Sequence, residues 1–330
     1  MNTKDGVLTL LERRRGEAVS GQELAAGLGV SRAAIWKAVE ALRQEGHNIA
    51  AAPNRGYCLD AKSDVLCLAS LLPHLKREAP LHVFQEVAST NTLLREMALK
   101  GAPHGTVVLA NQQSGGKGRR GRSFLSPAGG IYLSVLLRPQ APAQEATGIT
   151  IAACVGVCRA MRDLCGLEGE IKWVNDVFLR GRKVCGILTE AATSLENGML
   201  DYAVVGVGLN FRCPREGFPP ALRDIAGSLY GPEEEPPVSR CAMAAGLIDS
   251  LLEALEHFDR EDILAEYRAR SMVTGREVLV LRGEESRPAL AQSIQADGSL
   301  RVRYRDGSME DLCSGEVSIL PVKGQDLPTE

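Results

Sequence analysis

Long apolar runs and a strong charge of either sign are missing from this chain. No run is long enough for a signal peptide or a membrane span, and the N-terminus is polar and charged. The net charge is −3 over 330 residues, which excludes a protein that coats nucleic acid or membrane with its whole surface. We therefore expect a cytoplasmic protein with no membrane contact, whose contacts with anions are local.

Paired cysteines are missing as well. The 9 cysteines include no CxxC pair, and no histidine lies near Cys154 and Cys158 to complete a zinc set. Cysteines scattered in this way are typical of small buried hydrophobic residues in a reducing compartment. With 45% apolar residues, the chain can bury one large core or divide into two or three domains.

Against this background, residues 111–122 stand out as a basic stretch that contains no acid. The sequence NQQSGGKGRRGR holds four glycines, one lysine and three arginines. It lies between two apolar segments, 106–110 and 131–137, that are typical of buried strands. Glycines let backbone N–H groups face an anion, and arginine can bind phosphate or carboxylate through two parallel hydrogen bonds. We interpret the stretch as a mobile cover over an anionic ligand; the alternative is a solvated basic loop.

The first domain, residues 1–62, has the pattern of a winged helix-turn-helix. Three helices are expected over residues 7–15, 21–28 and 32–45, the second and third capped by Ser20 and Ser31. Segments 47–51 and 56–59 alternate like a small hairpin with its tip at 53–55. In this arrangement the later helix enters the DNA major groove. The candidate DNA contacts are Ser31, Arg32, Trp36, Lys37 and Arg55.

The charge of this first domain favours only weak binding to DNA. Residues 1–60 contain eight basic and seven acidic side chains, a net of +1, so phosphate neutralisation alone would bind DNA weakly. A dimer that binds two half-sites would compensate. The alternative for this domain is a helical module for protein interaction.

The second domain, residues 63–272, alternates strands and helices. Strands are expected at 82–87, 106–110, 131–137, 171–179, 183–190 and 201–210, and helices at 65–72, 90–100, 145–165, 241–258 and 261–269. Ser89, Thr90 and Asn91 open one helix and could either cap it or bind a ligand. Lys183 and Asp176 lie on adjacent strands, where they form either a structural salt bridge or part of a site.

The third domain, residues 273–330, is expected to be a small closed β-barrel. Its pattern changes to short strands at 277–281, 290–295, 300–304, 309–312 and 317–320. Asp297-Gly298 and Asp306-Gly307 are typical hairpin turns.

Four segments, taken in order, resemble one known family. They are Ser89-Thr90-Asn91, the loop GKGRRGR at 116–122, KWVND at 172–176 and KVCGIL at 183–188. With the N-terminal and C-terminal patterns, the chain resembles the bifunctional biotin protein ligases, also called biotin operon repressors. The resemblance implies an α+β multidomain protein: a winged helix-turn-helix, a central mixed sheet flanked by helices as in class II aminoacyl-tRNA synthetases, and an SH3-like barrel.

The resemblance also implies an activity and its partners. Biotin and ATP, with Mg²⁺, would give biotinoyl-5′-adenylate, and biotin would pass to a lysine of the biotin carboxyl carrier protein of acetyl-CoA carboxylase. With the adenylate as corepressor, a ligand-promoted homodimer would bind operator DNA. The alternative is a transcription regulator that senses a ligand without catalysis.

Roles follow from the same resemblance. Arg119, Lys183 and Asp176 are the implied catalytic residues, with Asp176 also placing the metal ion. Biotin would contact Ser89, Thr90, Asn91, Gln113, Lys117, Gly118, Arg119 and Lys183. The nucleotide would contact Gly116, Lys117, Arg119, Arg120, Asn175 and Asn210. Two residues depart from the family pattern: Lys117 replaces the usual arginine, and Val174 replaces the usual proline.

Overall fold

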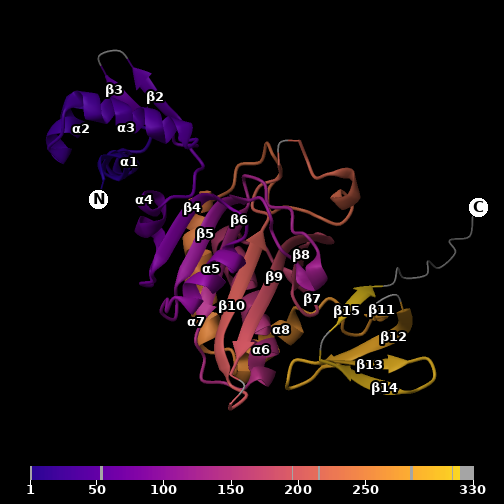
Figure 1. Cartoon of the computed structure of the whole chain (residues 1–330). Helices are drawn as coiled ribbons and strands as arrows, with labels where there is room; N and C mark the ends of the chain where they lie inside the picture. Colours follow the sequence, from indigo (N-terminus) through magenta and orange to yellow (C-terminus); the bar gives the residue numbers. More distant parts are fainter. Residues whose placement is uncertain are drawn as a thin grey trace, which may run out of the picture.

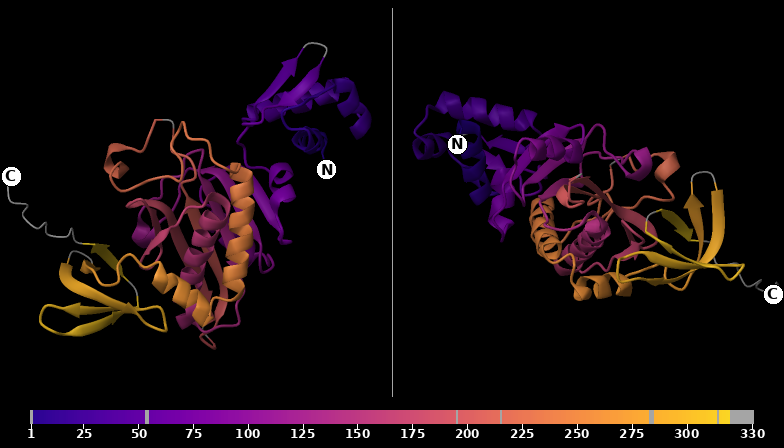
Figure 2. Two further views of the ribbon diagram at one scale, coloured as in Figure 1. Left: turned by 180° about the vertical axis from the view of Figure 1, so that it is seen from behind. Right: turned by 60° about the horizontal axis from the view of Figure 1, so that its bottom comes forward.

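The chain folds around three separate sheets, one for each segment of the sequence just described (Figure 1). The computed structural model describes residues 2–52, 55–194, 196–214, 216–282, 285–313 and 315–319. The N-terminal sheet with its helices lies at one end of the molecule and the C-terminal sheet at another, with the large central sheet between them (Figures 1 and 2). No helix in the described residues is long and apolar enough to cross a membrane.

The N-terminal domain is a helix-turn-helix with a small sheet, as predicted. Its elements are α1 (Thr3–Arg13), β1 (Ala18–Val19), α2 (Gly21–Leu28), α3 (Arg32–Gln44), β2 (Ile49–Ala52) and β3 (Gly56–Leu59). Ser20 Oγ accepts a hydrogen bond from Glu23 N at 3.0 Å, and Ser31 Oγ accepts one from Ala34 N at 3.2 Å, so both predicted caps form. Of the predicted hairpin tip, Pro53 and Asn54 lie outside the described residues.

The central sheet has seven strands in the order β4-β5-β6-β10-β9-β8-β7. It is mixed, because β4 and β5 pair in parallel and the other neighbours pair antiparallel. The strands are β4 (Leu81–Val87), β5 (Val107–Gln113), β6 (Ile131–Leu137), β7 (Glu170–Lys172), β8 (Asp176–Leu179), β9 (Arg182–Thr193) and β10 (Leu200–Leu209).

Helices cover both faces of this sheet, which explains why β6 is buried along its whole length. On one face, α5 (Thr90–Leu99) packs Leu94 and Ala98 against Val108, Leu136 and Val204. On the other face, α6 (Ala146–Cys165) forms the main core with α7 (Arg240–Glu256) and α8 (Glu261–Ala269), and Figure 2 shows these three from behind. Shorter elements are α4 (Leu68–Leu71) and the 3₁₀ turns η1 (Leu72–His74), η2 (Arg119–Gly121), η3 (Ala143–Glu145) and η4 (Pro220–Leu222).

The strand expected over 171–179 is instead a hairpin, so that prediction was wrong. β7 ends at Lys172, residues 173–175 form a turn, and β8 begins at Asp176. Contacts from distant segments hold the turn: Trp173 Nε1 donates to Gly298 O at 3.0 Å, and Tyr267 Oη donates to Val174 O at 3.0 Å. The Trp173–Val174 peptide bond is cis.

The C-terminal domain is a five-stranded antiparallel sheet in the order β14-β13-β12-β11-β15. The strands are β11 (Glu277–Arg282), β12 (Glu285–Ile294), β13 (Leu300–Tyr304), β14 (Met309–Leu312) and β15 (Glu316–Ile319). Both predicted hairpin turns lie between paired strands. Over the described part of this domain β14 and β15 are the two edges and do not pair, so the sheet is open where the sequence predicted a closed barrel; Leu320, expected in the last strand, lies outside the described residues.

Candidate active site

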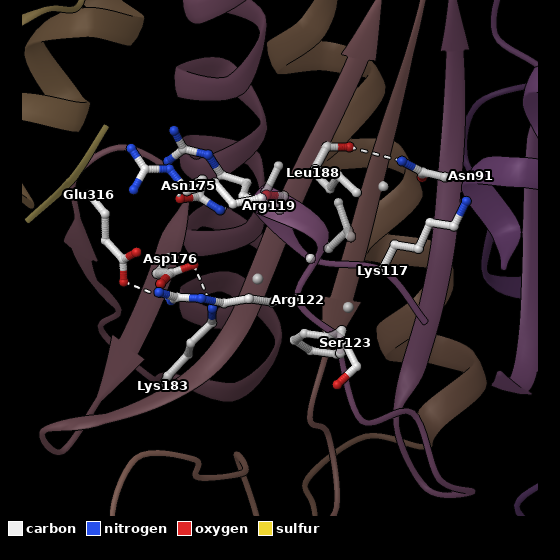
Figure 3. Close-up of a pocket in the computed structure, with 18 of the residues that line it drawn as sticks. Asn91, Lys117, Arg119, Arg122, Ser123, Asn175, Asp176, Lys183, Leu188 and Glu316 are labelled. Carbon is white, nitrogen blue, oxygen red and sulfur yellow. Dashed lines mark hydrogen bonds and ion pairs between the residues drawn. The ribbon is translucent and has the colours of Figure 1, made fainter. Parts of the chain in front are cut away.

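A cavity opens where the basic loop, the start of α5, strands β9 and β10, and the C-terminal sheet meet (Figure 3). Residues from all these elements line it, although they lie more than two hundred positions apart in the sequence, from Ser89 to Val317. Most of the residues predicted from the sequence are present: Ser89, Thr90, Asn91, Gln113, Lys117, Gly118, Arg119, Arg120, Asn175, Asp176 and Lys183.

One end of the cavity is a network of neutral polar groups at the start of α5. Ser89 caps the helix, accepting from Thr92 N at 3.4 Å. Gln113 Oε1 accepts from Thr90 N at 2.8 Å, so β5 is joined to the helix start. Ser134 Oγ lies within hydrogen-bond distance of both Thr90 Oγ1, at 2.8 Å, and Asn91 Oδ1, at 2.7 Å. The capping and ligand interpretations are therefore compatible, because capping uses Ser89 while Thr90 and Asn91 still line the cavity.

Two glycines on β10 make room for the side chains that shape this end. A Cβ at Gly206 would overlap Asn91 Oδ1, and a Cβ at Gly208 would overlap the ring of Phe124. Gly208 pairs with Gly186 on β9, where a Cβ would also lie 3.0 Å from that ring. Any larger residue at Gly206 or Gly208 would displace Asn91 or Phe124, so these two glycines permit the close approach of those side chains to β10.

The basic loop is folded as an irregular hairpin. Gln113 N donates to Ser126 O at 3.0 Å, Phe124 N to Gly116 O at 2.9 Å, and Gly118 N to Arg122 O at 2.7 Å. Arg120 adopts a left-handed conformation with φ 56°, which lets the chain reverse at the tip. The hairpin turns Arg119 inward and carries Lys117 on the side of Asn91 (Figure 3).

Arg119 is held by the turn between β7 and β8. Its Nη1 donates to Asn175 Oδ1 at 3.0 Å, and Asn175 Nδ2 in turn donates to Ile187 O at 2.8 Å. Burial lowers the pKa of Arg119, an effect that the nearby Asp176 carboxylate opposes. The guanidinium stays charged at neutral pH, because arginine does not deprotonate in proteins. The cavity therefore contains a fixed cation that is partly removed from water.

Lys183 and Asp176 meet across the hairpin of β8 and β9. Lys183 Nζ lies 2.6 Å from Asp176 Oδ1, with the two side chains 27% and 21% exposed. This is a close ion pair with poor hydrogen-bond alignment, because Asp176 Oδ1 is buried and has no hydrogen-bond partner among the described residues. The Asp176 carboxylate thus lies in the cavity wall already paired with the Lys183 ammonium.

The C-terminal sheet supplies an acid that sequence reasoning missed. Glu316 on β15 accepts from Arg122 Nη1 at 2.8 Å, which ties the basic loop to the last domain (Figure 3). Burial would raise the pKa of Glu316, but the hydrogen bond and charge of Arg122 lower it below its usual value. Nearby, burial lowers the pKa of Lys172, which also lines the cavity. No motif marks Glu316, because its role depends on how two domains pack.

Some predicted residues lie outside the cavity. Asn210 does not line it, and its Nδ2 donates to Gly227 O at 2.8 Å. Gly116 does not line it either; a Cβ there would overlap Phe124 O, so this glycine serves the loop fold. The predicted DNA contacts lie on the N-terminal domain and are all exposed: Ser31, Arg32, Trp36, Lys37 and Arg55.

Comparison with known proteins agrees with this geometry. Residues 83–210 match the model of the Biotin/lipoate A/B protein ligase family, and residues 5–58 match an HTH domain. The chain is 36% identical over 227 residues to the bifunctional ligase/repressor BirA of Bacillus spizizenii, covering 68% of this chain and 69% of that protein. The chain belongs to the biotin protein ligase family. The resemblance inferred from the four sequence segments is thereby confirmed.

Two further relatives extend this family assignment. BirA of Escherichia coli is 29% identical over 314 residues, which is 92% of this chain and 94% of that protein, so the likeness to a ligase/repressor runs through all three domains. The solved biotin protein ligase from Aquifex aeolicus in complex with biotin and ATP has a TM-score of 0.60 at 25% identity. It aligns over 73% of this chain and 99% of its own.

Proposed function

We propose that this ligase adenylates biotin with ATP in the cavity described above and then transfers biotin to a lysine of the biotin carboxyl carrier protein of acetyl-CoA carboxylase. The observation that carries the proposal is the placement of Arg119, Lys183 and the backbone of the basic loop around one cavity whose other end is neutral and polar. Such a cavity suits a ligand with a carboxylate at one end and an amide-like ring at the other.

In the first half-reaction, a biotin carboxylate oxygen attacks the α-phosphorus of ATP, a C–O–P linkage forms, and the bond to pyrophosphate breaks. Both reactants are anions, so their approach is unfavourable unless fixed cations offset the repulsion. Lys183 would lie between the carboxylate and the α-phosphate. Arg119, oriented by Asn175, would stabilise the charge on phosphorus, and Thr90, Asn91 and Gln113 would hold the ureido ring.

The wall beside the cationic end of the cavity would carry the nucleotide. Lys117, Arg120 and Gly118 on the loop would close over the adenylate and exclude water from the mixed anhydride. Asn175, which orients Arg119, would also contact the nucleotide. Asn210 and Gly116 would act on it only after a rearrangement, since neither lines the cavity now.

In the second half-reaction, the acceptor lysine amine attacks the biotinoyl carbonyl, a C–N bond forms, and AMP leaves. Asp176 would take the proton from the incoming amine or orient it. This role is supported by the place of Asp176 in the cavity wall, beside the Lys183 ammonium. Proton removal is needed because only the neutral amine is nucleophilic.

We also propose that Mg²⁺ takes part, with Asp176 as its protein ligand. The described residues contain no group of three or more His, Cys, Asp or Glu side chains that could hold a metal alone. The fit is therefore to an ion held mainly by phosphate oxygens and water, as Mg²⁺ often is, with one carboxylate from the protein. When bound, such an ion would neutralise charge on the phosphates.

We propose operator binding by a ligand-promoted homodimer as a second activity. It is supported by the exposed side chains of α3 and by a free strand edge: beyond residue 189 the side of β9 that faces away from β10 has no partner strand in the described residues. A second copy could pair there and bring two DNA-binding domains together, which would compensate for the low net charge of each.

The finer points of architecture are proposals of the same kind. We propose domain boundaries at 62/63 and 272/273, which fall between the three sheets. The central mixed sheet with its helices would be related to class II aminoacyl-tRNA synthetases, and the C-terminal five-stranded sheet would be an SH3-like domain. The order of five short antiparallel strands supports the second assignment.

Biotin-dependent exchange of radioactive pyrophosphate into ATP tests the adenylation step directly. We expect exchange that requires both biotin and Mg²⁺. A protein that only senses a ligand and regulates transcription would give no exchange, so this experiment also separates the two candidate functions.

A further inference from the structure

A buried arginine at the start of α7 joins three parts of the chain that have no sequence relation. Arg240 is 3% exposed. Its Nη1 donates to Gly130 O at 2.9 Å, its Nη2 donates to Asn111 Oδ1 at 2.9 Å, and its Nε lies 3.1 Å from Asp64 Oδ1. Nη2 also donates to the backbone carbonyl of Asp64. A guanidinium so fully removed from water is costly unless each donor is satisfied, and here all three nitrogens have partners.

Two of these partners are the two ends of the segment that contains the basic loop. Asn111 lies on β5 and is the first residue of the basic stretch, and Gly130 directly precedes β6, where the loop ends. The backbone at Gly130 packs closely against Tyr132, because a Cβ at this position would overlap the Tyr132 hydroxyl. Arg240 therefore joins the two ends of the loop that covers the proposed active site.

The third partner belongs to the connection between the DNA-binding domain and the central domain. Asp64 lies between β3 and α4, and the next residues are held by the same group: Leu66 N donates to Asn111 Oδ1, and Asn111 Nδ2 donates to Leu66 O, both at 2.9 Å. One end of α7 reaches this connection, as the view from behind shows (Figure 2).

The connection is in turn joined to the first helix of the DNA-binding domain. Arg15 Nη1 donates to Ser63 O at 2.8 Å, and Arg15 Nη2 lies 2.7 Å from Glu12 Oε1. Ser70 Oγ, on α4, donates to the same Glu12 oxygen. Hydrogen bonds, joined by the backbone between Ser63 and Asp64, thus lead from the base of the loop through Arg240 to α1.

Helix stability does not explain Arg240. It is the first residue of α7, whose N-terminus carries the positive end of the helix dipole, so a cation there is unfavourable for the helix itself. Buried ion pairs are also a weak source of stability compared with apolar packing. Arg240 destabilises its own helix, and all its hydrogen-bond partners belong to other segments. Its role is therefore to hold those segments together.

We propose that Arg240 is a positioning residue that couples ordering of the basic loop over its ligand to the connection that places the DNA-binding domain. The inference rests on the proposed function, in which biotin and ATP order the loop. Ligand-driven movement of the loop ends would change the geometry at Asn111 and Gly130, and Arg240 would pass that change to residues 63–66. Replacing Arg240 should therefore leave ligand-induced ordering of the loop in place but remove its effect on residues 63–66.

Hydrogen exchange of the full chain, with and without biotin plus MgATP, tests this proposal. In the unsubstituted protein we expect slower amide exchange in residues 114–130 and also in residues 60–70. In Arg240→Lys all donors sit on one nitrogen, which cannot reach acceptors that are now bound by three separate nitrogens of the guanidinium. Slowing in 114–130 should therefore persist, while slowing in 60–70 should fall at least fivefold, a change within the usual range of coupling energies.

Two further variants make the result decisive. Arg159→Lys is the matched control, because Arg159 on α6 also forms a half-buried ion pair, with Glu266 at 2.8 Å, but contacts neither loop nor connection. It should behave as the unsubstituted protein. Asp64→Asn keeps an acceptor for Arg240 but removes the charge, at a side chain that is 37% exposed. If Arg240→Lys does not fold, this variant replaces it, and the same loss of slowing in residues 60–70 is expected.

The possible outcomes are distinguishable. Equal ligand-induced slowing in 60–70 in Arg240→Lys and in the control overturns the proposal, as does slowing confined to 114–130 in the unsubstituted protein. If biotin and MgATP slow exchange nowhere, the proposed ligand site itself is wrong. Pyrophosphate exchange measured on the same samples should stay within about threefold of normal for a positioning role that acts on the connection rather than on the chemistry.

Discussion

Lys183 and Asp176 lie 2.6 Å apart although they are not direct cross-strand partners in the β8–β9 pair. Asp176 is opposite Gly186 and Lys183 is opposite Phe178, and the register shifts between Val177 and Phe178. This irregularity turns both charged side chains to the cavity side of the hairpin. A β-bulge next to a site often serves to re-aim a side chain in this way.

Replacing Lys183 should stop adenylation without unfolding the protein. We expect Lys183→Ala to lower the rate of biotin-dependent pyrophosphate exchange by about 100-fold or more, the usual cost of losing one preorganised charge-stabilising group. The thermal transition should remain cooperative. The matched control is Lys100→Ala at the exposed end of α5, which should exchange normally. Exchange by Lys183→Ala within a few-fold of normal would remove Lys183 from the reaction.

A methyl group at Gly206 should weaken biotin binding selectively. Its Cβ would displace Asn91, which is also held by Leu188 O at 3.1 Å and Glu190 Oε2 at 2.8 Å. We expect Gly206→Ala to raise KM for biotin about tenfold, equivalent to about 1.4 kcal/mol, with little change in KM for ATP. Gly231→Ala is the control, because the nearest side chain to a Cβ there would be Glu234 at 3.6 Å. Equal effects on both substrates would mean that Asn91 is not part of the biotin end.

The Arg122–Glu316 pair predicts a specific pH dependence. The folded-state pKa of Glu316 is lowered, so its contribution to stability is fully present above the unfolded value near 4.5 and is lost as pH falls through the folded value. The difference in melting temperature between the unsubstituted protein and Glu316→Gln should therefore be largest near neutral pH and shrink below pH 4.5. Arg122→Gln should behave alike, and the double variant should add little. A difference that grows on acidification would contradict this assignment.

Replacing Trp36 should affect DNA binding alone. Its side chain is 56% exposed on α3, so Trp36→Ala should change stability by about 0.5 kcal/mol or less. If α3 enters the groove, affinity for DNA from the promoter of the biotin genes should fall by about 1–3 kcal/mol, while pyrophosphate exchange stays normal. Met309, equally exposed at 56% on β14, supplies the control variant Met309→Ala. Fluorescence anisotropy measures the affinity; unchanged binding by Trp36→Ala would direct the search to another face.

Local patterns were enough to predict most helices and strands, although the helix expected over 65–72 covers only Leu68–Leu71 and is followed by a 3₁₀ turn. Ser20, Ser31 and Ser89 all cap helices as expected, because an N-cap depends on residues three apart. The turn at 173–175 was missed because apolar residues continue on both sides of Asn175 and Asp176, so these two polar residues were assigned to a single strand. Its shape depends on Gly298, Tyr267 and other residues far along the chain.

The site divides in the same way. Residues within the four motifs were found, since each motif brings its own chemistry. Glu316 was missed and Asn210 was misplaced for a common reason: the first reaches the cavity only through domain packing, and the second is drawn away by a hydrogen bond to Gly227 in an irregular segment. Neither the packing of Glu316 against the loop nor the hydrogen bond of Asn210 can be recognised from hydrophobic periodicity or motif spacing in the sequence.

The most direct test of the account is mass spectrometry of a biotin carboxyl carrier domain incubated with this protein, biotin and MgATP. We predict that the carrier gains the mass of one biotinoyl group on one lysine, that omission of biotin or ATP prevents the gain, and that Lys183→Ala does not support it. An unmodified carrier with the intact protein, or full modification with Lys183→Ala, would contradict the central claim that this cationic cavity joins biotin to the nucleotide.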